Sequence, residues 1–430
     1  MKVVHISRFD DGGGAAIAAF RLHKGLLRLG HQSVLFVAQS RSGVLDPTVT
    51  LFQPSMDLRS RLRRRVRTER IARSLARYQA SRPPGYESFS DDRSPYGADV
   101  LTQLPAGDLI NIHAMYQFVD YRTFFTAVPR HTPVVRTLHD MSFFTGGCHT
   151  DVGCGKYTAH CGACPQLGSR HAKDLAYQIW QRKSATFRTV PPGRLHLVTP
   201  SRWLATEVQR SALLHEFPVT VIPHGLDTET FCPRDRRFAR EVLGVPQEAR
   251  VVLFVGDPVH RPIKGFALLA QALTGLRELS DLLLISVGSG KPPVEVQTPF
   301  LHLGRIDNAR LLSLVYSAAD IFVIPSILEN APLTALEAIA CGTPVVGFAV
   351  GGIPEIVRHG VTGLVVPPKD VTALRATMYD LLQDAEKRAE MAMHCRRIAV
   401  QEYAMAVHVQ RYIELYQTIL ANHCSAMRPL

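Results

Sequence analysis

The chain alternates short apolar runs with longer amphipathic stretches over most of its length. KVVHI (2–6) is a β-branched run, and after polar residues and a glycine turn the segment 14–30 shows the apolar spacing of a helix that ends at glycine. The run SVLFVA (33–38) completes a first βαβ unit. The same pattern predicts later strands at 108–113, 133–140, 195–201, 219–225, 250–257, 281–288, 300–304, 319–326, 343–348 and 362–366. Strands that alternate with helices indicate parallel sheets covered on both faces.

The strands fall into two series, separated by the polar, proline-containing stretch DTETFCPRDRR (227–237). A chain of 430 residues also exceeds the usual size of a single hydrophobic core. We therefore predict an α/β fold of two doubly wound, Rossmann-like domains, 1–228 and 229–405, that face a cleft. Residues 406–430 are expected to form a helix that can pack back on the first domain. Open α/β sheets bind ligands beyond the carboxyl ends of their strands, so polar residues at strand ends are the first candidates for a site.

The composition mainly excludes other classes of protein. Hydrophobic residues make up 46% of the chain and charged residues 20%, which is typical of a globular protein and not of a disordered one. No apolar run approaches the ~18 residues that span a bilayer, and the start MKVVHISRFDD has too short an apolar stretch for a secretory signal. We expect a cytoplasmic protein. Its net charge of +12 suggests an anionic partner.

Most of the excess charge lies in one segment, Arg59–Arg77, which contains nine arginines and one glutamate. Two interpretations are open: a helix that contacts an anionic membrane or phosphate groups, and a basic face that only water contacts. No aromatic residues interleave with the arginines, so we expect no nucleic-acid partner. Read as a helix, the segment carries two apolar stripes offset by five residues: Leu58, Leu62 and Val66, and Ile71 and Leu75.

The stretch SILENAPLTALEAIACGTP (326–344) places two carboxylates among apolar residues, where each needs a partner. Glu329 falls in the loop after a predicted strand, and Glu337 falls inside a helix whose first turn holds Pro332. The helix-start N–H groups near residues 331–334 suit a diphosphate. The spacing alone also fits an ordinary helix-surface acid and a loop acid that favours the helix start.

The longer stretch ENAPLTALEAIACGTPVVGFAVGGIPEIVRHGVTGLVVPPKD (329–370) resembles the donor-binding region of retaining GT-B glycosyltransferases of family 4, including those that build bacterial exopolysaccharides. The GGGAA turn (12–16), LHD (138–140), TPSRWLA (199–205), IPHGLD (222–227) and Lys264–Gly265 fit the same family, so the resemblance covers most of the chain. It implies transfer of a hexose-type sugar from a nucleoside-diphosphate sugar to a saccharide or lipid-linked saccharide. It also implies retention at the anomeric carbon and no metal or other cofactor for catalysis.

Carried over residue by residue, the resemblance implies that Glu329 binds hydroxyls of the donor sugar and Glu337 binds the ribose. Lys264 would neutralise the diphosphate. The family's second cation, an arginine, stands where this chain has Asp257, so Arg261 is the expected substitute. The expected donor-binding residues beside Glu329 are Asn330, Ala331, Pro332 and Leu333.

The first domain offers its own candidates. His139 ends a predicted strand at the cleft edge, and the resemblance implies that it contacts the sugar while Asp140 orients it. His113, which ends the run DLINIH, is a second candidate by position. Gly13 and Gly14 allow a bound phosphate or acceptor to approach the backbone closely. This glycine run lacks the spacing and the downstream acid of a dinucleotide fingerprint, which makes a nicotinamide cofactor an unsuitable ligand.

A cysteine-rich insert (146–166) in the first domain contains four of the eight cysteines. Cys161 and Cys164 form a C-x-x-C pair, and Cys148 and Cys154 complete a set of four thiolates that suits a structural zinc ion. In a reducing cytoplasm the alternative is free thiols, since disulfides are disfavoured there. A closed four-ligand site would stabilise the loop and would not catalyse.

Two other classes of protein stay open at this point. A non-catalytic nucleotide-sugar-binding or scaffold protein of a membrane glycan assembly could have this sequence pattern, although the retained Glu329, Glu337, Lys264 and His139 count against it. A sugar-nucleotide epimerase could share the two-domain architecture, because fold alone does not fix function.

Overall fold

The computed structural model describes residues 1–41, 46–83, 88–276 and 278–426. The chain divides into two compact units. Unit 1 comprises Met1–Pro223 and His408–Leu430, and unit 2 comprises His224–Val407. The predicted domain limits at residues 228 and 405 lie close to these boundaries. No helix in the described residues is long and apolar enough to cross a membrane.

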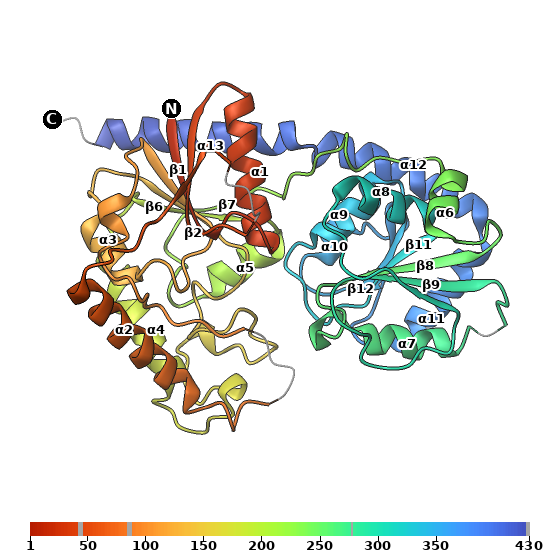
Figure 1. The fold of residues 1–430 in the computed structure, drawn as a ribbon, viewed down its shortest axis with the longest axis horizontal. Helices are drawn as coiled ribbons and strands as arrows, with labels where there is room; N and C mark the ends of the chain where they lie inside the picture. The colour runs from red at the N-terminus through yellow and green to blue at the C-terminus, as the bar shows by residue number, and fades with distance from the viewer. Residues whose placement is uncertain (42–45, 84–87, 277, 427–430) are drawn as a thin grey trace. The chain divides into compact units, whose positions relative to one another are not determined.

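The described part of unit 1 contains a seven-stranded parallel sheet in the order β3-β2-β1-β4-β5-β6-β7 (Figure 1). Its central strands β4 and β5 are buried along their whole length, as expected for a sheet covered on both faces. The strands are β1 (Lys2–Phe9), β2 (Gln32–Gln39), β3 (Val49–Leu51), β4 (Leu109–Ile112), β5 (Val134–Thr137), β6 (Leu195–Thr199) and β7 (Val219–Val221). The helices are α1 (Gly14–Arg28), α2 (Leu58–Ala76), α3 (Tyr121–Ala127), α4 (Leu175–Phe187), α5 (Arg202–Arg210) and α13 (Met405–Ala426).

The described part of unit 2 contains a six-stranded parallel sheet in the order β10-β9-β8-β11-β12-β13. The strands are β8 (Arg250–Val255), β9 (Leu282–Val287), β10 (Phe300–His302), β11 (Ile321–Ile324), β12 (Val345–Phe348) and β13 (Gly363–Val366). The helices are α6 (Arg236–Leu243), α7 (Phe266–Thr274), α8 (Ala309–Ala318), α9 (Leu333–Ala340), α10 (Ile353–Ile356), α11 (Val371–Gln383) and α12 (Ala385–Glu402), and the 3₁₀ helix η4 (Pro262–Lys264) precedes α7.

Both sheets show the doubly wound strand order, so the prediction of two Rossmann-like domains is confirmed. The order reverses between β1 and β4 in unit 1 and between β8 and β11 in unit 2. At such a switch point two neighbouring loops leave the sheet in opposite directions and open a crevice for ligands. Every predicted strand is present. The structure adds β3, a three-residue edge strand that is too short to give a visible period.

The C-terminal helix α13 is held to the sheet of unit 1 by hydroxyl groups. Tyr416 accepts a hydrogen bond from the Asn111 amide (2.6 Å), and the Tyr412 hydroxyl lies 3.1 Å from the hydroxyl of Thr137. Both tyrosines are buried. The Thr137 hydroxyl also donates to Asn111 Oδ1 (3.0 Å), so the tyrosines complete a buried polar network.

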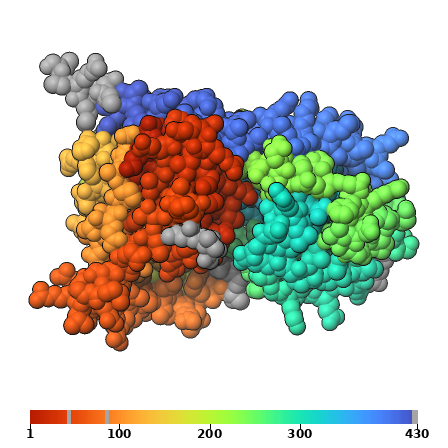
Figure 2. All heavy atoms as spheres, turned by 45° about the horizontal axis from the view of Figure 1, so that its top comes forward, coloured from red at the N-terminus to blue at the C-terminus, as the bar shows by residue number. Residues whose placement is uncertain are grey.

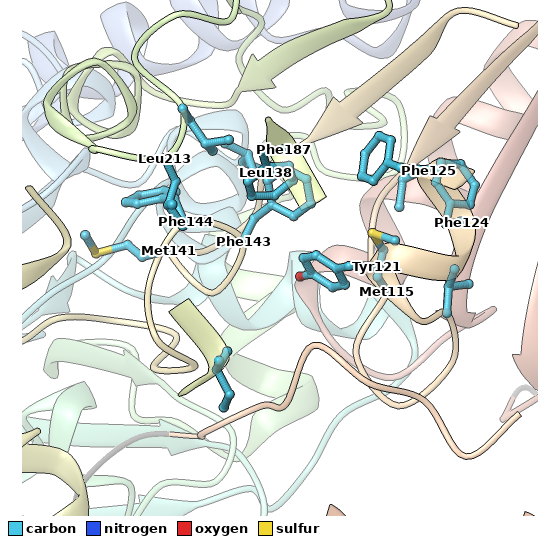
Figure 3. Packing of buried hydrophobic residues seen from close by; sticks show 14 of the residues in the cluster. Met115, Tyr121, Phe124, Phe125, Leu138, Met141, Phe143, Phe144, Phe187 and Leu213 are labelled. Carbon is cyan, nitrogen blue, oxygen red and sulfur yellow. The ribbon is translucent and has the colours of Figure 1, made fainter. Parts of the chain in front are cut away.

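An aromatic cluster fixes the segment that follows β5. Leu138 and Met141 are 0% and 1% exposed, and Figure 3 shows Phe143 and Phe187 beside Leu138. The Phe143 and Phe187 rings lie 5.0 Å apart between centroids, within the range of favourable ring contacts. The two residues between Leu138 and Met141 are therefore anchored on both sides.

The arginine-rich segment forms α2 on the surface of unit 1, where it is coloured orange-red in Figures 1 and 2. Asp57 caps the helix by accepting a hydrogen bond from the Ser60 amide (2.8 Å). The two apolar stripes differ in role. Leu75 packs against the core of the unit, whereas Leu58 and Leu62 are 81% and 64% exposed. The C-terminal end of the helix is therefore attached to the unit, and the apolar side chains at its N-terminal end are exposed.

Candidate functional site

The switch point of unit 2 brings two of the candidate residues into contact. Lys264 ends the 3₁₀ helix η4, which follows β8, and Glu329 lies in the loop between β11 and α9. The two loops meet because β8 and β11 are neighbouring strands. The Lys264 Nζ lies 2.5 Å from Oε1 of Glu329, and the Ser326 hydroxyl donates to the same oxygen (3.0 Å). The side chains are only 23% and 15% exposed. The result is a compact, partly buried ion pair at the place where this fold binds ligands.

Two glycines allow these loops to pack closely. Gly265, at φ 73°, has no room for a Cβ, which would lie 1.8 Å from the carbonyl oxygen of Pro325 at the end of β11. Gly351, at φ 55°, is packed in the same way against the carbonyl oxygen of Glu329, which also accepts a hydrogen bond from the Gly352 amide (2.9 Å). Backbone contacts therefore fix the positions of both Lys264 and Glu329.

Glu337 lies in α9 and is 8% exposed. The hydroxyl of Tyr316, from α8, donates to its carboxylate (3.1 Å). Burial and the charge of Glu337 raise the pKa of Tyr316 well above its usual value, so this hydroxyl stays protonated and donates. A ligand hydroxyl that bound Glu337 would share the carboxylate with Tyr316 or displace it.

The start of α9 differs slightly from the prediction. Pro332 is the N-cap and not a first-turn residue, and α9 begins at Leu333. The first intrahelical bonds run from the amides of Ala335 and Leu336 to the Pro332 carbonyl. The N–H groups of the residues before Ala335, which include the candidates Ala331 and Leu333, lie at the positive end of the helix dipole. Asn330 joins this turn to Glu329.

The second predicted cation, Arg261, is the N-cap of η4, and its carbonyl accepts a hydrogen bond from the Lys264 amide (2.9 Å). It therefore lies one turn from Lys264, and its role toward a phosphate stays a prediction. Asp257 accepts a hydrogen bond from the Ser289 amide (2.9 Å) and lies 3.7 Å from Arg305. Burial favours the neutral acid, but the hydrogen bonds from Ser289 and the charge of Arg305 outweigh it and lower the pKa of Asp257. Sequence reasoning missed this network because its members are far apart in the chain.

In unit 1 the candidates His113 and His139 belong to a row of three histidines, in which His5 and His113 are buried and His139 is partly exposed. His113 follows β4, His139 follows β5, and His5 lies in β1. Nδ1 of His5 lies 3.1 Å from Nε2 of His113, and Nδ1 of His113 lies 3.2 Å from Nε2 of His139. Burial lowers the pKa of His139 to about 3 and the pKa values of the other two well below the usual range. The row is therefore neutral at physiological pH.

His5 was missed by sequence reasoning, although a signal for it exists. Its run VVHI (3–6) is apolar apart from this histidine, and a polar residue inside a buried strand needs a partner. Asp140, which was expected to orient His139, accepts from the Ser142 amide (2.8 Å) and lies 2.7 Å from Nδ1 of His149. Its role toward His139 stays a prediction.

The glycine turn after β1 has the backbone that the prediction requires. Gly13 is the N-cap of α1 at φ 133°, and a Cβ there would meet nothing within 4 Å. Gly14 is the first residue of the helix. The turn therefore leaves open space beside the helix start, where a ligand could approach the backbone. Whether it binds the donor stays a prediction.

The structural zinc site predicted for the cysteine-rich insert stays a prediction. In the part of the chain that the structure describes, no group of three or more histidine, cysteine or acidic side chains could hold a metal ion. Cys148, Cys161 and Cys164 instead lie in the hydrophobic core of unit 1, and Cys154 is half-buried. Burial raises the pKa of Cys161 to about 12, so the thiol stays protonated. The buried thiols contribute to apolar packing as they stand.

Comparison with solved structures places the fold in the GT-B class. The chain is similar to sucrose-phosphate synthase from Thermosynechococcus elongatus, with a TM-score of 0.68, 19% identity and coverage of 98% of this chain and 99% of that one. It is also similar to Alr3699/HepE from Anabaena in complex with UDP and glucose, with a TM-score of 0.62, 18% identity and coverage of 97% and 99%. At these identities the likeness shows the fold alone.

Sequence comparison is more specific within unit 2. Residues 249–384 match the family described as Glycosyl transferases group 1. The chain is 33% identical over 234 residues to D-inositol 3-phosphate glycosyltransferase from Thermobispora bispora, which covers 50% of this chain and 54% of that protein. The chain thus spans about half the length of the curated relatives it matches. The matched family segment contains Lys264, Glu329 and Glu337.

Proposed function

We propose that the protein is a retaining glycosyltransferase that moves a hexose-type sugar from a nucleoside-diphosphate sugar to a saccharide or lipid-linked saccharide. The observation that carries the proposal is the Lys264–Glu329 ion pair at the switch point of unit 2. The match of residues 249–384 to a glycosyltransferase family supports it. So does the similarly folded HepE, whose structures were solved with UDP and with UDP-glucose.

Donor binding would exchange the partners of the ion pair. The diphosphate of the donor offers anionic oxygens to the ammonium of Lys264, and the sugar offers hydroxyl donors to the carboxylate of Glu329. Each charge therefore keeps a partner when the pair opens. A buried charge that lost its partner would be strongly unfavourable, so this exchange explains how a partly buried pair can still be used for binding.

Transfer would break the bond between the anomeric carbon and the diphosphate oxygen. Positive charge develops on the sugar ring and negative charge on the leaving diphosphate. Lys264, Arg261 and the N–H groups at the start of α9 stabilise the leaving group electrostatically. The acceptor oxygen forms the new bond on the face that the diphosphate leaves, and its proton passes to a phosphate oxygen. The products are a glycoside and a nucleoside diphosphate, and the step needs no cofactor.

The test is thermal unfolding of the protein with a panel of uridine and guanosine diphosphates and their sugars. A ligand at ~100 times its dissociation constant adds about 2.7 kcal/mol to the free energy of unfolding. We expect one nucleotide series to raise the melting temperature, and Glu337→Gln to remove the effect. Glu390→Gln, at an exposed position of α12, is the matched control and should keep it. No shift with any nucleotide in the folded wild-type protein would overturn the donor site.

A non-catalytic nucleotide-sugar-binding protein is the second candidate, and a separate readout distinguishes it. The nucleotide sugar that binds is incubated with the protein and with saccharide acceptors, and release of the nucleoside diphosphate is followed. The proposed enzyme releases it faster in the presence of an acceptor. A binding protein would show the thermal shift and no release with any acceptor.

Helix α2 supports an acceptor at an anionic membrane surface. All of its residues are at least partly exposed, and its arginines surround the exposed apolar side chains of Leu58, Leu62 and Val66. Arg67 reaches back into the unit, where it contacts Asp120 (3.0 Å). A helix with apolar groups among arginines can insert its apolar side chains between lipid headgroups while the arginines contact phosphate groups. We therefore place the acceptor reaction at such a surface.

A further inference from the structure

Two arginines, Arg8 and Arg41, lie at the carboxyl edge of the sheet of unit 1. Arg8 is the last but one residue of β1, and Arg41 follows the end of β2 by two residues. The two strands are neighbours, and Phe9 pairs in register with Gln39 at their ends. Open α/β sheets bind their ligands beyond this edge. The strand order therefore brings both arginines to an edge of the unit that is suited to binding.

Both guanidinium groups lie over the same aromatic ring. The guanidinium carbon of Arg41 is 3.6 Å from the centroid of the Phe9 ring, and that of Arg8 is 4.6 Å from it. The guanidinium carbon of Arg8 is also 5.3 Å from the centroid of the Tyr116 ring, in the segment that follows β4. Such contacts hold a guanidinium by its flat face and leave the N–H groups at its rim for hydrogen bonds. We call Arg8 and Arg41 the arginine pair.

The arginine pair concentrates positive charge at a partly buried position. Burial lowers the pKa of Arg8, and the positive charge of Arg41 lowers it as well, although Tyr116 and Tyr96 act in the opposite direction. In the described part of the chain no carboxylate forms an ion pair with Arg8. A charge that is partly withdrawn from water normally has an opposite charge or a ligand as its partner. The position of Arg8 therefore calls for an anionic ligand.

Two aspartates next to the arginine pair bind backbone amides. Asp10 accepts a hydrogen bond from the Arg41 amide (2.7 Å), and Asp11 accepts one from the Gly12 amide (2.7 Å). The side chain of Arg41 donates to the carbonyl of Gly12 (3.3 Å). These bonds fix Arg41 beside the glycine turn, where a Cβ on Gly13 would meet nothing within 4 Å. The turn thus leaves room for a ligand next to the two cations.

We propose that the arginine pair is an anion site that binds a phosphate group of the acceptor. The planar fork of a guanidinium matches two oxygens of a phosphate group, and two guanidinium groups can neutralise a doubly charged one. The assignment to the acceptor rests on the proposed function, in which the diphosphate of the donor binds Lys264 of unit 2. The binding of phosphate by the pair does not rest on it.

The site is tested with inorganic phosphate as the probe and without a sugar donor. Calorimetric titration uses the protein with Lys264→Ala, which removes the cation proposed for the donor. In this background we expect Arg8→Gln and Arg41→Gln each to weaken phosphate binding about tenfold, the effect of losing one charge-assisted hydrogen bond. Arg28→Gln, at an exposed position of α1, is the matched control and should bind phosphate as before.

No phosphate binding by the Lys264→Ala protein, or equal affinity in all these variants, would overturn the site. Arg41 is exposed, so its replacement should leave the fold intact. Arg41→Gln therefore decides the test even if Arg8→Gln does not fold.

A transfer assay distinguishes the acceptor from the donor as the source of the phosphate. Saccharides that differ by one phosphate group are compared as acceptors, with the nucleotide sugar that stabilises the protein as donor. We expect the wild type to prefer the phosphorylated acceptor about tenfold in kcat/KM, and Arg8→Gln to lose this preference while the thermal shift with the donor stays.

No preference in the wild type, or loss of the donor shift in Arg8→Gln, would overturn the assignment to the acceptor. Absence of transfer with any acceptor, beside intact phosphate binding, would instead count against the proposed function and with it the assignment to the acceptor. The titration with inorganic phosphate would still decide the anion site.

Discussion

The two units have the same strand order around their switch points but opposite electrostatics there. In unit 1 three histidines, two of them buried, are neutral and lie within hydrogen-bonding distance of one another. In unit 2 a lysine and a glutamate form an ion pair at a partly exposed position. The shared topology explains why polar residues gather at these points. Burial and pairing decide whether they carry charge, and hence which chemistry each unit can perform.

The largest expected difference between the units is in acid. Burial lowers the pKa values of His139 to about 3 and of His23 and His408 to about 4, and all three belong to unit 1. In the unfolded chain these histidines bind a proton below pH ~6.5, whereas in the folded chain they stay neutral down to about pH 4. The free energy of unfolding is therefore highest above pH ~6.5 and falls as the pH is lowered toward about 4. At about pH 5 each histidine should lower the free energy of unfolding of unit 1 by about 2 kcal/mol.

The measurement is denaturant unfolding at neutral pH and at about pH 5, followed by tryptophan fluorescence. Trp180 and Trp203 are the two tryptophans of the chain and both lie in unit 1, so the signal reports that unit. Hydrogen exchange of peptides from unit 2 provides the comparison. A fluorescence transition that did not move to lower denaturant in acid would contradict the account of the buried histidines.

The next largest effect is expected from the glycine contact that supports the site of unit 2. Gly265→Ala places a Cβ 1.8 Å from the carbonyl oxygen of Pro325, so the backbone must move, and we expect a loss of about 4 kcal/mol. Gly360 is the matched control, since its φ is 78° and a Cβ there meets nothing within 4 Å. Gly360→Ala should cost only about 1 kcal/mol. Equal losses in urea unfolding would show that the close approach does not fix the loop.

A smaller loss of stability is expected when a tyrosine hydroxyl is removed, and the loss should be larger where the hydroxyl bonds to a charged group. Tyr316→Phe in unit 2 removes a donor to the buried carboxylate of Glu337, and should cost about 2 kcal/mol. Tyr412→Phe in unit 1 removes a contact to the neutral hydroxyl of Thr137, and should cost about 1 kcal/mol. Thermal unfolding of both variants measures the difference. The reverse order would mean that Glu337 has other partners that carry its charge.

Substitutions in α2 should have the smallest effect on stability, but they should change binding to anionic membranes. Leu58 and Leu62 are exposed, so replacing both by serine should alter the free energy of unfolding by less than about 0.5 kcal/mol. The same change should weaken co-sedimentation with anionic liposomes, which salt should also weaken. Phe238→Ser, at a 55% exposed position of α6, is the control. Equal liposome binding by all three proteins would remove α2 as a membrane contact.

Sequence reasoning placed the strands and the loop residues of the site because those signals are local. A short apolar run that ends in a polar residue marks a strand end, which is how Glu329, His113 and His139 were found. The contacts could not be found this way. The pairing of Lys264 with Glu329 spans 65 residues, and His5 is bonded to His113 across 108. Such pairs follow from strand order, which a local pattern does not contain.

The cysteines show a limit of spacing as a signal. Their spacing in the sequence fits metal ligands, but spacing does not say which way side chains point. In the structure Cys148 and Cys161 belong to the hydrophobic core of unit 1. The zinc site stays a prediction.

The central claim is that Lys264 holds the diphosphate of the donor, and calorimetric titration tests it most directly. The nucleoside diphosphate that stabilises the protein and its parent nucleoside are each titrated into the wild type, Lys264→Ala and the exposed-site control Lys387→Ala. The account predicts that Lys264→Ala weakens the diphosphate about 100-fold, the worth of a charge-assisted bond, and leaves the nucleoside unchanged. Equal affinity of the diphosphate for all three proteins would contradict it.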